Sequence, residues 1–564
     1  MKNVDFAWSD VALTIGVLVV LFTAYALVDL VSRKEGLRGL TERLTLPEHL
    51  EGAAILTAAA VAGRFWNWSM LPDGEVLRAW GLWLLAPMVW KTVTLDIDVG
   101  TGRAQRAERL LLVLTLVGAV FSPAAMGAAV WLLGRRFHAW LHHASLSMRH
   151  LQLHFAFSLA WLGVAHTPLA RFGSDPYLLA ALTMHASHYW VTAFAKGWMG
   201  GRWYGWVWDN RLHDLAASAY SWGWARFLPE ATYLRFVRML KRLDRPAQGV
   251  AFLLEALAPL ILVDRRFAVA LLVGWVAFHL VVFLASGILF LEWIFVNAGL
   301  VYLVSAHPHT DSVLGWPAFV VGCLVMVVLP FRGVLWQARP LAWWDAPWIQ
   351  KIEWFVTGES GTKYRLHNDF MCPHERLYGR IHGIFMFPRP MVGFHLGEVF
   401  LRELRDVILA SGGRPEQLAE VQRAYGIDTR DAALRERHET YLKAFFARLN
   451  RGAPKYMLPK GLRWLKYPGG QCYYWGEQPA YQRQEPVVSV EAVYREEFFD
   501  GDGFRDLGRQ TVMEIDIPEG EVPPAEEIHE REIEALFNAR AMGRLIKLPR
   551  FVPKAYAQNK GAQF

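Results

Sequence analysis

Ionisable side chains inside long apolar stretches are the residues of this sequence whose types could carry chemistry. Lys196 ends the apolar run that begins at Tyr189, and His279 lies in the middle of another, between Trp275 and Phe283. Charged groups at such positions are costly to desolvate and are candidates for function. A desolvated lysine favours the neutral amine, which can accept a proton. The alternative is a lysine at a helix end that extends its ammonium group to the lipid headgroups.

His279 needs a hydrogen-bond partner, because an imidazole in an apolar environment is destabilised without one. Asn297 lies on the next apolar stretch and could be that partner. Glu255 and Glu292 lie on neighbouring apolar stretches and need partners for the same reason. We predict that Lys196 and His279 face one apolar cavity, to which Glu255 and Glu292 contribute. The alternative for His279 is a structural tie between helices.

A second group of candidates is a set of histidines between residues 138 and 154. His143, His150 and His154 fall within about 40° of one another on a helix, and His185 and His188 follow on the next apolar stretch. Neutral imidazole suits iron, copper or zinc. The spacing therefore predicts that His143, His150 and His154 hold a metal, with structural or interfacial histidines as the alternative.

Tryptophans crowd into a segment directly after Lys196, which we place at residues 197–248. Trp198, Trp203 and Trp206 are followed by Trp208, Trp222 and Trp224. Tryptophan prefers the membrane boundary, where one end of the ring is apolar and the other is wet. The segment is predicted to lie along the bilayer surface, as an anchor or as a lid. In the second case Trp198, Trp203 and Trp206 bind a lipophilic substrate that enters from the lipid.

The elements that position these residues follow from composition. The 564 residues are 54% hydrophobic and only 20% charged, against about 25% charged in soluble proteins. Apolar runs long enough to cross a bilayer fill the first 330 positions. They predict an all-α polytopic transmembrane bundle of about eight to ten helices at residues 1–334. A mixed α/β extramembrane domain follows at 335–564, so we expect a multi-pass protein of a bacterial inner (plasma) membrane.

The net charge of +7 fits basic loops on anionic membrane lipid. No run of lysine and arginine forms a patch of the kind that binds nucleic acid. The expected partners are therefore membrane lipid and a lipophilic small molecule, and no nucleic acid.

Three stretches together resemble the horizontally transferred transmembrane family, which includes the vitamin K-dependent gamma-glutamyl carboxylase. They are Tyr189–Trp206, which contains Ala195-Lys196, then Phe252–Leu260, which contains Glu255, and Phe278–Trp293, which contains His279. The resemblance covers roughly residues 76–306, and the order and spacing of the stretches agree. The sequence departs from the family at Gly197, where the carboxylase has a second lysine.

The resemblance implies that Lys196 is the base that deprotonates a reduced, vitamin K-like quinone and that His279 assists it. It also implies that His143 corresponds to a family histidine upstream, and it leaves a protein substrate as a further partner. The leading prediction is thus a carboxylase-like membrane enzyme, with epoxidase-type lyase or oxidoreductase chemistry, that acts on a quinone or another lipophilic substrate. Two alternatives stay open: a histidine-ligated, metal-dependent membrane oxidoreductase, and a non-enzymatic lipid-binding or assembly protein.

Overall fold

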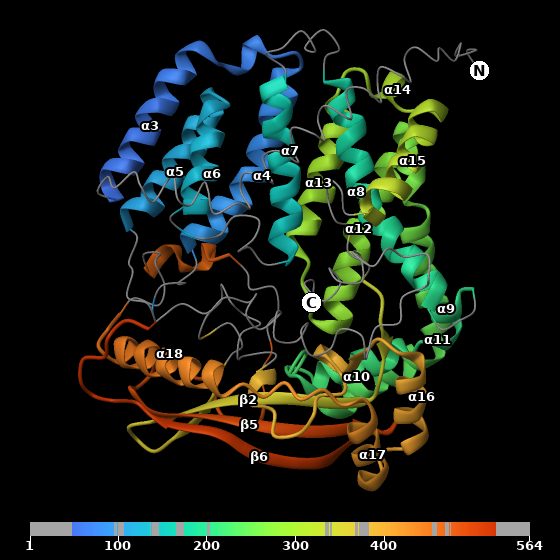
Figure 1. Cartoon of the computed structure of the whole chain (residues 1–564), viewed down its shortest axis with the longest axis vertical. Coiled ribbons are helices and arrows are strands. Elements are labelled where there is room, and N and C mark those ends of the chain that lie inside the picture. The colour runs from blue at the N-terminus through green and yellow to red at the C-terminus, as the bar shows by residue number, and fades with distance from the viewer. Residues whose placement is uncertain are drawn as a thin grey trace.

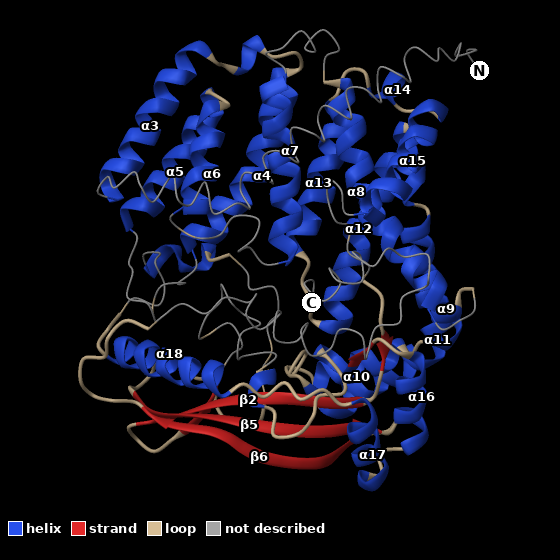
Figure 2. Ribbon diagram, in the orientation of Figure 1, coloured by secondary structure: helices blue, strands red, loops and turns tan. Residues whose placement is uncertain are grey.

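The computed structural model of this chain consists of a helical layer above a layer built around a β-sheet (Figures 1 and 2). It describes residues 48–94, 99, 106–135, 137, 146–164, 174–199, 203–332, 338, 341–366, 370, 383–453, 460–467, 473 and 475–525. The first of the apolar runs, at about residues 11–31, and the predicted ligand His143 lie outside the described residues.

The helical layer is made of apolar helices that stand side by side in Figure 1. They are α3 Glu48–Phe65, α4 Gly74–Thr94, α5 Arg106–Phe121, α6 Ala124–Arg135, α7 Leu146–Val164, α8 Asp175–Trp198, α12 Arg265–Ser286, α13 Leu291–Ala306 and α15 Trp316–Arg332, with the short α14 Thr310–Val313 and the 3-10 turns Trp68–Met70 and Ala258–Leu262. Local signals set both ends of α12. The carboxylate of Asp264 caps α12 by accepting from the Arg266 amide. Gly287 ends the same helix in the left-handed conformation that suits glycine.

Two helical segments among the described residues are long and apolar enough to cross a membrane. They are Glu230–Leu262 and Arg265–Ser286. Three further apolar helices are shorter: Ala124–Gly134, Leu291–Ala306 and Trp316–Met326. The prediction of a mainly helical chain with strands in its C-terminal part is confirmed for the residues that the structure describes. The prediction of eight to ten spans stays a prediction.

The tryptophan-rich segment forms a connection between the layers. It contains α9 Gly205–Asp209, α10 Leu212–Ser221 and the first part of α11 Glu230–Ala256. Helix α11 continues through Pro246 without a break, so the predicted boundary at residue 248 falls inside one helix. In Figure 1, α10 lies next to the sheet, and α11 rises from it beside the helical layer.

The lower layer is built on an antiparallel sheet in the order β3-β2-β5-β6. Its strands are β2 Trp348–Gly358, β3 Lys363–Arg365, β5 Val487–Phe499 and β6 Phe504–Asp516, and a separate pair consists of β1 Trp344–Asp345 and β4 Glu398–Val399. The helices of this layer are α16 Arg402–Ser411, α17 Pro415–Tyr425 and α18 Ala432–Asn450, with 3-10 turns at Ile384–Met386, His395–Gly397 and Lys460–Leu465. Helix α18 lies between the sheet and the helical layer (Figure 1).

The hydrophobic interior is divided between the two layers. One cluster of buried side chains lies within the helices and includes Trp80 and Trp275. A second cluster surrounds the sheet and includes Trp206 and Trp222 from the tryptophan-rich segment. These two tryptophans therefore pack with the sheet layer, where side chains of the C-terminal part cover them.

A buried carboxyl pair lies where the layers meet. Asp345 and Glu398 are direct partners in the β1–β4 pair. Asn210 donates to Asp345 Oδ2 (2.7 Å), and its own Oδ1 accepts from the Asp345 amide (2.8 Å). Burial raises the pKa of Asp345 to about 7. Burial, and then the charge of Asp345, raise the pKa of Glu398 well above its usual value.

Replacing Glu398 with glutamine is expected to stabilise the protein at alkaline pH. Because its pKa is raised in the folded protein, Glu398 contributes fully to stability below its pKa in the unfolded chain, about 4.3. This contribution is lost as the pH rises through the pKa of the folded protein. Glu398→Gln should change the free energy of unfolding little at pH 4 and increase it by on the order of 1 kcal/mol at pH 8. Denaturant unfolding at both pH values measures this. An equal effect at the two pH values would contradict the assignment.

Candidate functional site

Lys196 is buried and paired at the end of α8. Its side chain sits in the last turn of that helix and is 7% exposed. The ammonium group donates to both carboxylate oxygens of Glu255 on α11, at 2.7 and 2.8 Å. It also lies 4.5 Å from the centre of the Trp206 ring. Two of the residues singled out from the sequence, Lys196 and Glu255, are thus brought into direct contact, and the Trp206 ring lies against the ammonium group of Lys196.

The Lys196–Glu255 pair can act in proton transfer. A proton that passes from the ammonium to the carboxylate leaves a neutral amine beside a neutral acid, and the amine can then take a proton from a substrate. Because both groups are buried, neither ion is well solvated, and the pair depends on its two short hydrogen bonds.

His279 on α12 belongs to a different set of contacts. Its Nε2 atom lies 2.9 Å from the hydroxyl of Tyr189 on α8. Tyr189 precedes Lys196 by seven residues, which is about 10 Å along a helix. Lys196 and His279 therefore have different partners. They are connected only in that Tyr189, the partner of His279, lies on the same helix as Lys196. The expected partner Asn297 reaches His279 only through this hydroxyl, to which its Nδ2 donates at 2.9 Å.

The contacts of Asn297 extend into a buried hydrogen-bonded chain. The side chain of Asn297 on α13 also meets His185 on α8, with 2.8 Å between Oδ1 and Nε2. His185 Nδ1 in turn lies 3.0 Å from Nε2 of His150 on α7. Three helices are thereby tied by polar side chains inside an apolar layer. Tyr189 was not singled out from the sequence, although its place two helical turns before Lys196 on an apolar run was a usable signal.

Two of the three predicted metal ligands lie together. His150 and His154 on α7 and His185 on α8 have ligand atoms that all lie within 4.8 Å of one another. His185 joins them in the cluster, and His143 lies outside the described residues. The helical spacing was thus sufficient to bring His150 and His154 onto one face.

Glu292, which the sequence predicted to contact substrate, forms a second buried ion pair. Its carboxylate accepts from Lys91 on α4 at 2.9 Å. Lys91 was not singled out from the sequence, although it lies at the end of an apolar stretch and carried the same signal as Lys196.

The three tryptophans predicted to bind substrate lie in different environments. Trp206 is buried and donates from Nε1 to the Trp343 carbonyl at 2.9 Å. Trp203 is 60% exposed, and its ring contacts that of Trp198 at 4.6 Å between centroids. Only the exposed part of the segment can therefore contact lipid, whereas Trp206 stays close to Lys196.

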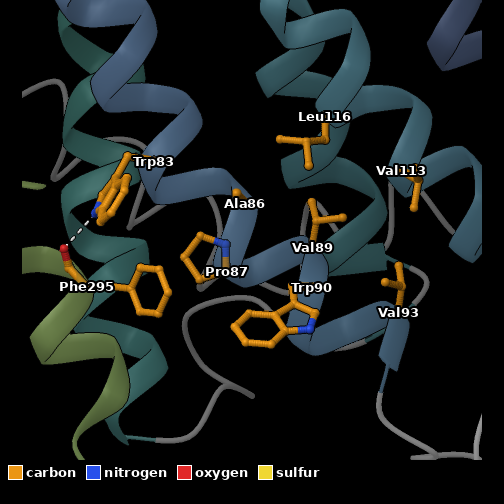
Figure 3. A pocket seen from close by; sticks show the side chains of 9 residues that line it. All are labelled: Trp83, Ala86, Pro87, Val89, Trp90, Val93, Val113, Leu116 and Phe295. Atoms are coloured by element: carbon orange, nitrogen blue, oxygen red, sulfur yellow. Dashed lines mark hydrogen bonds between the residues drawn. The ribbon is translucent and has the colours of Figure 1, made fainter. Parts of the chain in front are cut away.

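An apolar cavity of about 440 Å³ lies between α4, α5 and α13 (Figure 3). Its lining residues are Trp83, Ala86, Pro87, Val89, Trp90, Val93, Val113, Leu116 and Phe295. The indole N–H of Trp83 donates to the Phe295 carbonyl at 2.7 Å, as Figure 3 shows. The lining presents hydrocarbon surface, which suits a hydrocarbon tail. This cavity is formed by residues other than the predicted set around Lys196 and His279.

Comparison with known proteins gives no relative on which a function could be based: no family model, no curated protein and no solved structure matches the chain.

Proposed function

We propose that this chain is a multi-pass enzyme of a bacterial inner membrane that removes a proton from a lipophilic substrate of the reduced-quinone class. The observation that carries the proposal is the buried contact of Lys196 with both oxygens of Glu255. A lysine and a carboxylate in an apolar layer can exchange a proton and leave an amine that acts as a base. The resemblance of residues 189–206 to the base segment of the carboxylase family supports the same role for Lys196.

The membrane placement is supported by apolar side chains that point outward from the helical layer. On α5 the exposed residues Leu110, Val113, Leu114, Val117 and Phe121 follow helical spacing along one face. A further exposed set on α12 consists of Phe267, Val273, Leu280, Val281 and Leu284. Apolar faces of this length are unfavourable in water and favourable against lipid tails. We infer that α5, which is too short to qualify as a span by itself, also contacts lipid.

The apolar cavity between α4, α5 and α13 supports a substrate with a hydrocarbon tail. The same cavity favours a second candidate function, in which the chain binds such a lipid without chemistry. In the first case the quinol head must approach Lys196, and in the second case only the tail is recognised. A protein substrate, as in the carboxylase, would be a further partner of the first function.

The test is the consumption of a prenylated naphthohydroquinone by the purified protein in oxygenated detergent solution. Lys196→Met is expected to lower the rate by about 10²–10⁴-fold, which is the usual contribution of a general base. Lys91→Met is the matched control, because it also removes the lysine of a buried pair in the helical layer.

The outcomes separate the two functions. Folded Lys196→Met protein that turns over at the wild-type rate would rule out the base. Binding of the hydroquinone without turnover by the wild-type protein would favour the lipid-binding function.

A further inference from the structure

The cluster of His150, His154 and His185 lies in the interior of the helical layer. All three side chains are buried, at 4%, 0% and 0% exposure. Their candidate ligand atoms lie within 4.8 Å of one another, and one pair, His150 Nε2 and His185 Nδ1, is 3.0 Å apart. In a tetrahedral site with metal–nitrogen bonds of 2.0–2.1 Å, nitrogen ligands lie about 3.3–3.4 Å apart. One pair is therefore already close to this spacing, and ligand atoms up to 4.8 Å apart would have to approach by up to about 1.5 Å to share one ion.

The protonation of His185 follows from its neighbour Asn297. Asn297 Nδ2 donates to the Trp293 carbonyl at 2.9 Å, which fixes the orientation of the amide. Its Oδ1 must then accept from His185 Nε2 at 2.8 Å. His185 consequently carries its proton on Nε2 and directs the lone pair of Nδ1 into the cluster. Orientation of a histidine by an amide or carboxylate that holds its other nitrogen is typical of metal sites.

The buried imidazole ring of His154 has two polar nitrogens to which the described residues give no hydrogen bond. Neither of its ring nitrogens has a hydrogen-bond partner among the described residues, and the Nδ1 atom of His150 has none there either. Burial of such atoms without a partner costs free energy. A phenylalanine would fill the same space without that cost, and a ligand bound to the ring would account for the histidine.

We propose that His150, His154 and His185 bind one transition-metal ion of the zinc or copper class. Three neutral imidazoles without a carboxylate are the ligand set that these ions accept, and three protein ligands leave a fourth position open. His185 would bind through Nδ1. His150 would bind through Nε2 after its proton moves to Nδ1, a tautomer change that leaves the charge of the ring unaltered.

Aromatic rings enclose the proposed site. The ring of Trp293 stacks on His150 with 3.7 Å between centroids, and that of Trp80 meets His154 edge-on at 6.0 Å. Such a shell limits access of water and keeps the imidazoles in place. Lys196 belongs to the Glu255 pair and takes no part in this cluster.

The test is metal binding by the purified full-length protein. After removal of metals with a chelator, titration with Zn²⁺ should restore one ion per chain, and Co²⁺ should give the visible absorption of a tetrahedral site. His154→Phe should weaken Zn²⁺ binding by more than about 100-fold. It should leave the thermal unfolding of the metal-free protein unchanged or raise its midpoint, because it removes buried atoms without partners. Asn297→Leu should weaken Zn²⁺ binding by about 10–100-fold.

The control is His438→Phe, which replaces a buried histidine of the sheet layer that packs against Trp354 and should not alter Zn²⁺ binding. Wild-type protein that retains neither Zn²⁺ nor Co²⁺ would overturn the proposal. So would folded His154→Phe protein that binds Zn²⁺ as the wild type does, since the ion would then lie elsewhere.

Discussion

Replacing Lys351 with methionine is expected to destabilise the protein by about 3–5 kcal/mol, the usual cost of breaking a buried ion pair by removing one partner. Lys351 lies on β2 and is fully buried. Its ammonium group lies 3.0 Å from Glu353 and 3.0 Å from Glu497, and it donates to the Ser221 carbonyl at 2.5 Å. Methionine removes one of the two cations beside the carboxylates and leaves Glu353 and Glu497 with Arg495 alone, at 3.4 and 2.9 Å. It also removes the hydrogen bond from the sheet to the Ser221 carbonyl of α10.

The matched control for this prediction is Lys363→Met on the adjacent strand β3. Lys363 pairs with Glu491, but its side chain is 38% exposed. An exposed pair contributes only about 0–1 kcal/mol. Guanidinium unfolding followed by tryptophan fluorescence measures both variants. Equal losses for the two lysines would show that burial of Lys351 does not determine its contribution.

Low pH should remove the stabilisation from the Lys351–Glu497 ion pair in the wild-type protein. Burial by itself would raise the pKa of Glu497, but Lys351 and Arg495 outweigh it and hold the pKa at about 2. The stabilisation from Glu497 is therefore complete above its unfolded pKa of about 4.3 and is lost as the pH falls toward 2. Between pH 5 and pH 3, Lys351→Met should lose less stability than the wild type does.

Replacing Lys196 with methionine is the second change with a large expected effect. The variant leaves Glu255 buried without its cation, which should cost about 3–5 kcal/mol in unfolding free energy. The double variant Lys196→Met/Glu255→Leu should recover most of this loss, because apolar side chains of similar size replace a buried pair at little cost. Unfolding of the detergent-solubilised protein measures both variants. A double variant as unstable as Lys196→Met would mean that packing, rather than charge, accounts for the effect.

The sequence was sufficient for the features that depend on local patterns. Long apolar runs predicted helices through the first 330 residues, and helices are present there among the described residues. Helical spacing placed His150 and His154 on one face, because positions four apart share a side of a helix. Because Lys196, Glu255 and Glu292 are ionisable residues in apolar runs, the sequence predicted that they are buried. All three are buried.

Patterns of this kind do not specify which distant residues meet. Lys196 and Glu255 were both singled out, yet their pairing across 59 positions was not predicted. Lys91 and Glu292 are 201 positions apart, and Asn210 meets Asp345 across 135. Each contact depends on how whole helices and strands pack, and the free energy of that packing is a sum over many side chains.

The sequence by itself therefore determined which segments are apolar enough to be helices and which polar groups they must carry into the interior. It did not determine the environment of Trp206, since tryptophan suits a membrane boundary and a protein interior equally well, and the sheet layer covers this one. Only the tertiary structure decided that Asn297 orients His185 toward His150 and His154. The physical reason is that a buried polar group must find its partner in space, and a chain folded in three dimensions supplies that partner from any position in the sequence.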